Sequence, residues 1–85
     1  IAVGVGELDF RMDVYPVPFS TNLKIESEKI IKSIQVVEFT GRTILDKQFN
    51  MYVISLETEA WANGVYFLKM ELNDQQITRR VVKSE

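Results

Sequence analysis

The sequence of 85 residues contains no cysteine and no histidine. Without cysteine the chain forms no disulfide and has no thiolate ligand or cysteine nucleophile. Without histidine it lacks the side chain that most often serves as general base or zinc ligand. No apolar run approaches the roughly 20 residues that a membrane-spanning helix requires, and the net charge of −2 gives no strong attraction to nucleic acid. We therefore expect no enzyme activity, no metal, no cofactor, no membrane span and no nucleic-acid partner.

The chain has the length of one small domain, for which the expected free energy of unfolding is only about 4–13 kcal/mol. Because the first residue is Ile1 rather than Met, we expect the chain to be a piece of a longer protein. Residues 1–6, with glycines at positions 4 and 6, are interpreted as the end of an interdomain linker. Residues 7–85 are then the domain itself.

Ten Val, eight Ile, five Thr and nine aromatic residues favour an all-β fold, since these residues suit a pleated, half-buried surface. Polar and apolar residues alternate strictly over 7–14, which predicts a strand with one face exposed to solvent. The start of 29–39 also fits a helical stripe, although a strand is favoured there. The further strands are predicted at 21–26, 29–39, 43–49, 52–56, 65–72 and 76–83.

Turn residues separate these segments. Pro16 and Pro18 fix φ and remove two ladder donors after the first strand, so we expect them to end that strand and to block edge pairing. Gly41 is expected in a hairpin that needs positive φ, Gly64 in a second turn, and Asn73-Asp74 in a third. Seven short strands joined by such turns predict a seven-stranded immunoglobulin-like β-sandwich.

The residues 57–63 are expected to form a polar loop with one helical turn that carries Trp61. Trp61 could be an aromatic platform for a sugar or a protein partner, but a lid over one end of the sandwich is the favoured interpretation. The carboxylates of Asp9, Asp13, Glu57 and Glu59 do not have the dense loop spacing of a calcium site, so we assign no metal.

Three blocks of sequence carry a resemblance to a known family. The chain resembles the type A C-terminal sorting domain of the Bacteroidetes type IX secretion system, also called the Por secretion system, from about Val14 to its end. Val17 stands where that family usually has Asn between the two prolines, and Trp61 replaces a smaller aliphatic residue. The matching blocks are Val14-Tyr15-Pro16-Val17-Pro18-Phe19, Thr40-Gly41-Arg42, and Asn63-Gly64-Val65-Tyr66-Phe67-Leu68-Lys69 running to Arg79-Arg80-Val81-Val82-Lys83.

The resemblance implies a secretion signal on the C-terminal end of a larger cargo protein. In that family the cargo crosses the inner membrane by a signal peptide and passes through the periplasm. The outer-membrane translocon then recognises the folded domain, and a cysteine-peptidase-like sortase removes it at the cell surface. The implied partners are therefore the translocon, the sortase and the N-terminal cargo domain. An open strand edge would in addition allow self-association.

The family's terminal motif falls on a basic last strand, so we expect translocon recognition by Gly64, Tyr66, Arg79, Arg80, Val82 and Lys83. The motif turns are assigned to Tyr15, Pro16, Pro18, Gly41 and Arg42. A purely structural interpretation is favoured residue by residue. In this interpretation Gly64 is needed for its backbone angles, and Tyr66 and Val82 belong to the core. The cations Arg79, Arg80 and Lys83 then lie on a solvent-exposed face or protect the strand edge from pairing. Arg42 is then a solvated hairpin residue.

One rival function remains open. A stand-alone immunoglobulin-like adhesion or carbohydrate-binding module would share the fold and could use Tyr52, Trp61 and Tyr66 as a contact face. A sorting domain must lie at the extreme C-terminus of its parent protein, whereas an adhesion module can lie anywhere.

Overall fold

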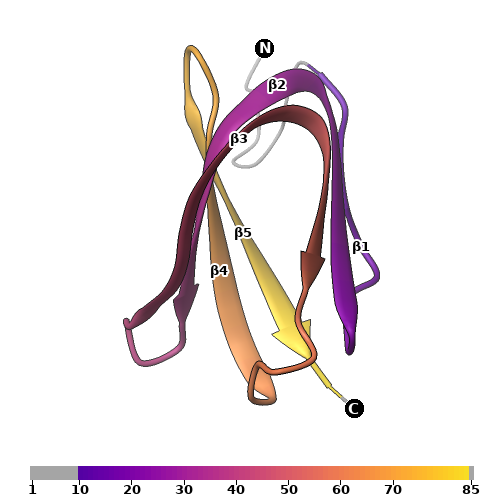
Figure 1. Ribbon diagram of the computed structural model, residues 1–85, viewed down its shortest axis with the longest axis vertical. Helices are drawn as coiled ribbons and strands as arrows, with labels where there is room; N and C mark the ends of the chain where they lie inside the picture. The colour runs from indigo at the N-terminus through magenta and orange to yellow at the C-terminus, as the bar shows by residue number, and fades with distance from the viewer. Residues whose placement is uncertain (1–9, 85) are drawn as a thin grey trace, which may run out of the picture.

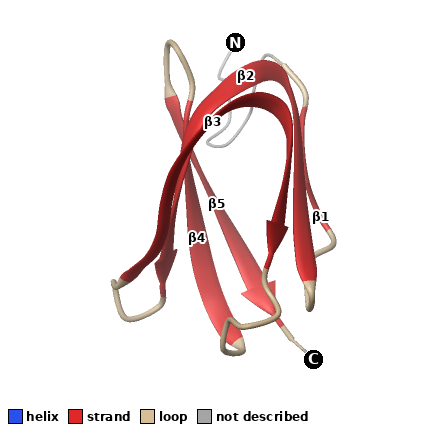
Figure 2. Cartoon of the chain, viewed as in Figure 1, coloured by secondary structure: helices blue, strands red, loops and turns tan. Residues whose placement is uncertain are grey.

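The computed structural model describes residues 10–84 and contains five β-strands in this range. The linker expected over 1–6 and the first part of the strand expected over 7–14 lie outside the described residues. Every strand pair is antiparallel and all belong to one sheet, so the all-β prediction is confirmed (Figures 1 and 2). The strands are β1 (Met12–Tyr15), β2 (Asn22–Glu38), β3 (Thr43–Glu57), β4 (Gly64–Glu71) and β5 (Gln76–Lys83).

The sheet folds over on itself because β2 and β3 are long and bend together into an arch (Figure 1). The strand order is β1-β2-β4-β5, with β3 on the other side of β2. The first half of β2 pairs with β1 and with the second half of β3. The second half of β2 pairs with β4 and with the first half of β3. Two layers therefore share these two strands.

The predicted count of seven strands is wrong. The segments 21–26 and 29–39, expected as separate strands, form the single strand β2, and 43–49 and 52–56 form β3. The pairing of β2 with β3 is interrupted by a register shift between Glu26 and Ile31, and Asn50 has a positive φ of 54°, so the hairpin bends at these positions while both strands continue past them. Polar residues lie at the bend, so the sequence there has the pattern of a loop between two strands.

The same bend explains the helical spacing at the start of 29–39. Ile31 and Ile34 are both fully buried although they are three residues apart, which a regular strand does not allow. A second register shift lies between Ile31 and Ser33. Before it the odd-numbered residues of β2 face the core, and after it the even-numbered residues do. The preference for a strand over a helix in this segment is confirmed.

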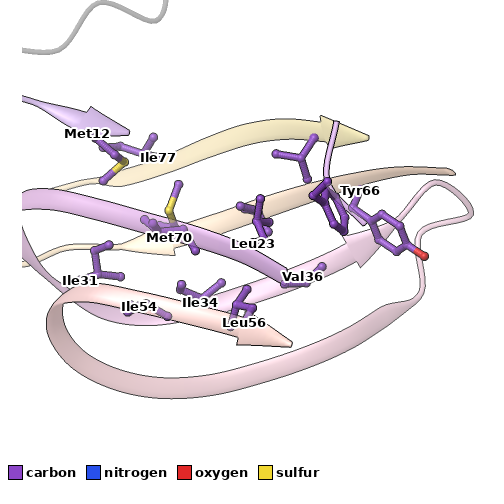
Figure 3. Close-up of a cluster of buried hydrophobic side chains, with 14 of the residues drawn as sticks. Met12, Leu23, Ile31, Ile34, Val36, Ile54, Leu56, Tyr66, Met70 and Ile77 are labelled. Atoms are coloured by element: carbon purple, nitrogen blue, oxygen red, sulfur yellow. The ribbon is translucent and has the colours of Figure 1, made fainter. Parts of the chain in front are cut away.

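The core fills the space between the two layers and receives side chains from all five strands (Figure 3). Tyr66 is one of them, which confirms the prediction that it belongs to the core. The buried apolar residues are Met12, Phe19, Leu23, Ile25, Ile31, Ile34, Val36, Ile54, Leu56, Tyr66, Leu68, Met70, Leu72, Ile77 and Val81.

The expected turns are in place. Gly41 has φ +96° in the turn between β2 and β3, and Gly64 has φ +147° where β4 begins; both values are ones that residues with a Cβ rarely adopt. The β4–β5 hairpin closes with a hydrogen bond of 2.8 Å from the Leu72 amide to the Gln75 carbonyl. In residues 10–84 no helix has the length and apolar character needed to cross a membrane.

Candidate functional site

The last residue of β5, Lys83, is buried and only 2% exposed. Its Nζ donates hydrogen bonds to the backbone carbonyls of Thr58, Glu59 and Trp61, at 2.7, 3.0 and 2.6 Å. An ammonium group offers three donors, and bonds from a charged donor are about twice as strong as neutral ones. Lys83 therefore fixes the loop between β3 and β4 to the end of the chain's last strand.

The expectation that Lys83 is a solvated cation is wrong. In β5 the side chains of Ile77, Val81 and Lys83 share the inner face, since side chains alternate along a strand. The long methylene stem of Lys83 follows the core residues, and the loop carbonyls receive its charged end. In the folded domain this side chain does not offer its charge to an approaching partner.

A short backbone bridge closes the same end of the domain. Phe19 pairs in parallel with Lys83, with hydrogen bonds of 2.9 Å from the Phe19 amide to the Val82 carbonyl and from the Ser84 amide to the Phe19 carbonyl. β1 ends at Tyr15, immediately before the proline turn, as the strand-ending interpretation of the prolines predicts. Pro16 and Pro18 are exposed, and both of their preceding peptide bonds are cis.

Three aromatic rings pack together at the same end of the domain. The Phe19 ring centroid lies 5.8 Å from that of Trp61, edge to face, and 6.1 Å from that of Tyr66. The ring centroids of Trp61 and Tyr66 are 5.1 Å apart. Trp61 is half-buried against the core, which confirms the interpretation of this residue as a lid. Its loop is a turn and not the expected helical turn, closed by a 3.0 Å hydrogen bond from the Trp61 amide to the Thr58 carbonyl.

The hydroxyl of Tyr66 donates a hydrogen bond to the Ala62 carbonyl and so binds β4 to the loop before it. Burial raises the pKa of Tyr66 above its usual value, and the negative charge of Glu38 raises it further. The neutral phenol is therefore the form that the fold favours.

Thr58 was not identified from the sequence. It is fully buried, its hydroxyl donates to the Ser20 carbonyl at 2.9 Å, and its amide donates to the Thr21 carbonyl at 3.0 Å. Thr58 thus joins the β3–β4 loop to the turn between β1 and β2. A threonine in a polar segment gives no sign of this role, because threonine is equally common on strand surfaces.

The β2–β3 hairpin lies at the same end of the molecule. The Arg42 guanidinium is 3.1 Å from the Glu38 carboxylate, and the Thr40 hydroxyl donates to that carboxylate at 2.5 Å. The Thr40 hydroxyl, followed by Arg42, lowers the pKa of Glu38. A shallow pocket is lined both by residues 38–40 of this hairpin and by residues 62–66. The three sequence blocks therefore meet at one end, which we call the Lys83 end: residues 16–21, 38–42, 58–66 and 82–84.

The predicted recognition residues divide between the inside and the outside of the domain. Tyr66 and Lys83 point inward, and Gly64 lies opposite Lys83 in the β4–β5 ladder. Arg80 and Val82 lie on the outer face, so the expectation that Val82 belongs to the core is wrong: its neighbour Val81 is buried instead. Arg79 is half-buried on the inner face and lines a groove together with β1 residues. The motif-turn residues Tyr15 and Arg42 are exposed.

The aromatic contact face of the rival module does not assemble. Trp61 and Tyr66 belong to the Lys83 end, whereas Tyr52 lines a pocket beside the β4–β5 hairpin together with Asn73 and Asp74. Among residues 10–84 no group of three or more carboxylates could hold a metal ion.

The model of one protein family, described as the secretion system C-terminal sorting domain, matches residues 13–84. The chain belongs to this family. The match covers all three sequence blocks and every described strand apart from the first residue of β1, and it confirms the resemblance to type IX sorting domains. No curated protein matches the chain.

A similar fold occurs in a solved structure of PorZ, described as an essential bacterial surface component of the type-IX secretion system of Porphyromonas gingivalis. The TM-score is 0.73 at 16% sequence identity, and the alignment covers 87% of this chain but only 11% of PorZ. At this identity the likeness shows a shared fold. This sorting domain thus corresponds to a small part of that much longer protein.

Proposed function

We propose that this sorting domain is the C-terminal secretion signal of a larger cargo protein and directs it through the type IX secretion system to the cell surface. The observation that carries the proposal is the family match over residues 13–84. The convergence of the three sequence blocks at the Lys83 end supports it, because a folded signal needs a defined three-dimensional feature and not only a linear motif.

In this proposal the precursor crosses the inner membrane by its own signal peptide and passes through the periplasm. The outer-membrane translocon then recognises the folded sorting domain, and a sortase removes it from the cargo at the surface. The domain is a substrate of this machinery and not an enzyme. The composition agrees with that role, since there is no histidine or cysteine to act as base or nucleophile.

The rival role as an adhesion or carbohydrate-binding module has weaker support. Sugar-binding modules use exposed aromatic rings on one face. Here Tyr66 is buried, Trp61 packs on Phe19, and Tyr52 is the remaining exposed ring of the three, in a different part of the domain.

The test is a fusion of the 85 residues to the C-terminus of a reporter with a signal peptide. It is expressed in a type IX-competent host and in the same host lacking the translocon. We expect reporter on the surface of the competent host at a mass that lacks the domain, and full-length fusion in the periplasm of the other. Equal surface exposure in both hosts would contradict export by this route, and surface reporter that keeps the domain would contradict its removal.

A further inference from the structure

The outer edge of β5 carries backbone groups that point away from the sheet. The bonds of Phe19 to the Val82 carbonyl and the Ser84 amide show that even-numbered residues at this end direct their polar groups to the edge. By strand alternation, the amide and carbonyl of Thr78 and Arg80 face the same way. No residue of 10–84 outside β4 is paired with β5 at these two positions. The β5 edge, which we define as Thr78–Val82, is therefore open at its centre.

The side chains of the β5 edge itself are neutral or basic, and the carboxylates of Asp13 and Glu26 lie on its inner side, in the groove that Arg79 also lines. On the outer face, Arg80 lies opposite Phe67, Thr78 opposite Lys69, and Val82 opposite Val65. The residues of β5 include no carboxylate. Glu71 is the acidic residue of β4; it lies opposite Gln76, beyond this patch, and accepts a hydrogen bond from Ser33.

These charges oppose pairing with a second copy of the chain. Two β5 edges paired antiparallel around their centres would place Arg79 opposite Arg79 or Arg80 opposite Arg80. Like charges directly opposite one another destabilise a strand pair, and basic residues are a common protection of sheet edges. The self-association expected from an open edge is therefore disfavoured at this one.

We propose that the β5 edge accepts an extended strand from a partner protein whose outward side chains are acidic. The partner's backbone would pair with Thr78 and Arg80, its carboxylates would lie beside Arg80 and Lys69, and its apolar side chains would continue the inner face. A strand fits better than a membrane surface, because lipid does not satisfy a row of backbone donors and acceptors. The inference adds a binding surface for the partner to the proposed function. It rests on the proposed function for the identity of that partner, which is a component of the translocon.

Two synthetic peptides test this in vitro with the whole 85-residue chain, labelled with ¹⁵N. One has the sequence Thr-Val-Glu-Val-Glu-Val-Thr with blocked ends, and its matched control has Lys in place of both Glu residues. We expect the acidic peptide to slow hydrogen exchange at the Thr78 and Arg80 amides and to bind at least about tenfold more tightly than the basic peptide. The Arg80→Glu variant should reverse this preference, whereas Lys32→Glu, at an exposed site in β2, should keep it.

Several results would overturn the inference. These are unchanged exchange at Thr78 and Arg80 with about 1 mM acidic peptide, equal affinity for both peptides, and protection by self-association of the chain without peptide. If the chain binds phosphatidylglycerol vesicles and has equal affinity for the two peptides, this face binds an anionic membrane instead. If the reporter is exported but the peptides bind equally, the inference fails and the proposed function stands. If the acidic peptide binds as expected but no reporter is exported, the proposed function fails alone.

Discussion

The ammonium nitrogen of Lys83 lies 2.6 Å from the carbonyl oxygen of Trp61. Two more carbonyls of the same loop, those of Thr58 and Glu59, accept from this nitrogen. One buried cation thus donates hydrogen bonds to three carbonyls of a turn that contains no regular secondary structure. The end of the last strand and the β3–β4 loop form one structural unit, and a change at Lys83 should alter both.

Replacing Lys83 by Met should destabilise the domain strongly. Methionine keeps the apolar stem but removes the donors, so the loop carbonyls lose a charged partner, with an expected cost of about 3 kcal/mol. That is a large part of a total stability of about 4–13 kcal/mol, and the Tm should fall by more than about 10 °C. The matched control is Lys32→Met at an exposed position. Equal Tm values for the two variants would show that the Lys83 bonds add no stability.

Tyr66 should make the domain less stable at high pH. Its pKa is raised in the folded state, so the unfolded chain releases the phenol proton first. The stability from Tyr66 is then complete below pH ~10 and is lost as the pH rises through the folded-state pKa. Urea unfolding at several pH values should show a smaller alkaline loss for Tyr66→Phe than for the unchanged chain.

The same phenylalanine variant should lose about 1 kcal/mol at neutral pH, because the hydrogen bond to the Ala62 carbonyl is absent. Tyr52→Phe is the control for the alkaline slope, since Tyr52 is exposed and lies in a different part of the domain, beside the β4–β5 hairpin. An alkaline slope for Tyr66→Phe identical to that of the unchanged chain would exclude Tyr66 as the source.

Thr58→Val should cost about 1–2 kcal/mol although it preserves the shape of the side chain. The substitution removes the hydroxyl that donates to the Ser20 carbonyl and leaves this acceptor without that partner inside the fold. Thr78→Val, on the exposed face of β5, should change the free energy of unfolding by less than about 0.5 kcal/mol. A Thr58 variant as stable as the Thr78 variant would mean that the loop is held without this bond.

Much of the fold was predictable from local pattern. The last strand was predicted with the bounds that the structure has, because alternation and the Asn73-Asp74 turn define it from both sides. The continuity of β2 and β3 was not predictable, since a bulged, bent strand and a loop share polar interruptions such as the one at Asn50. Two adjacent valines, Val81 and Val82, fit either face equally well. Only their pairing with Tyr66 and Val65 decides between them.

The site was predicted less well than the fold. The sequence blocks identify the family and the positions of the turns, but they do not show which residues point inward. The sequence led us to expect Val82 in the core and Lys83 in solvent, whereas in the structure Lys83 shares the inner face of β5 with Ile77 and Val81. Without the positions of the loop carbonyls, however, a buried ammonium had no visible partner, and an exposed cation was the simpler expectation.

The role as a terminal secretion signal is tested most directly by the position of the domain in its fusion protein. In a type IX-competent host, the surface-exposed fraction of a reporter is measured with the 85 residues at its C-terminus and with a second folded module added after them. We expect surface reporter only with terminal placement, and retention in the periplasm when the domain is internal. Equal surface exposure from both fusions would contradict the account and favour a module that acts wherever it lies in its protein.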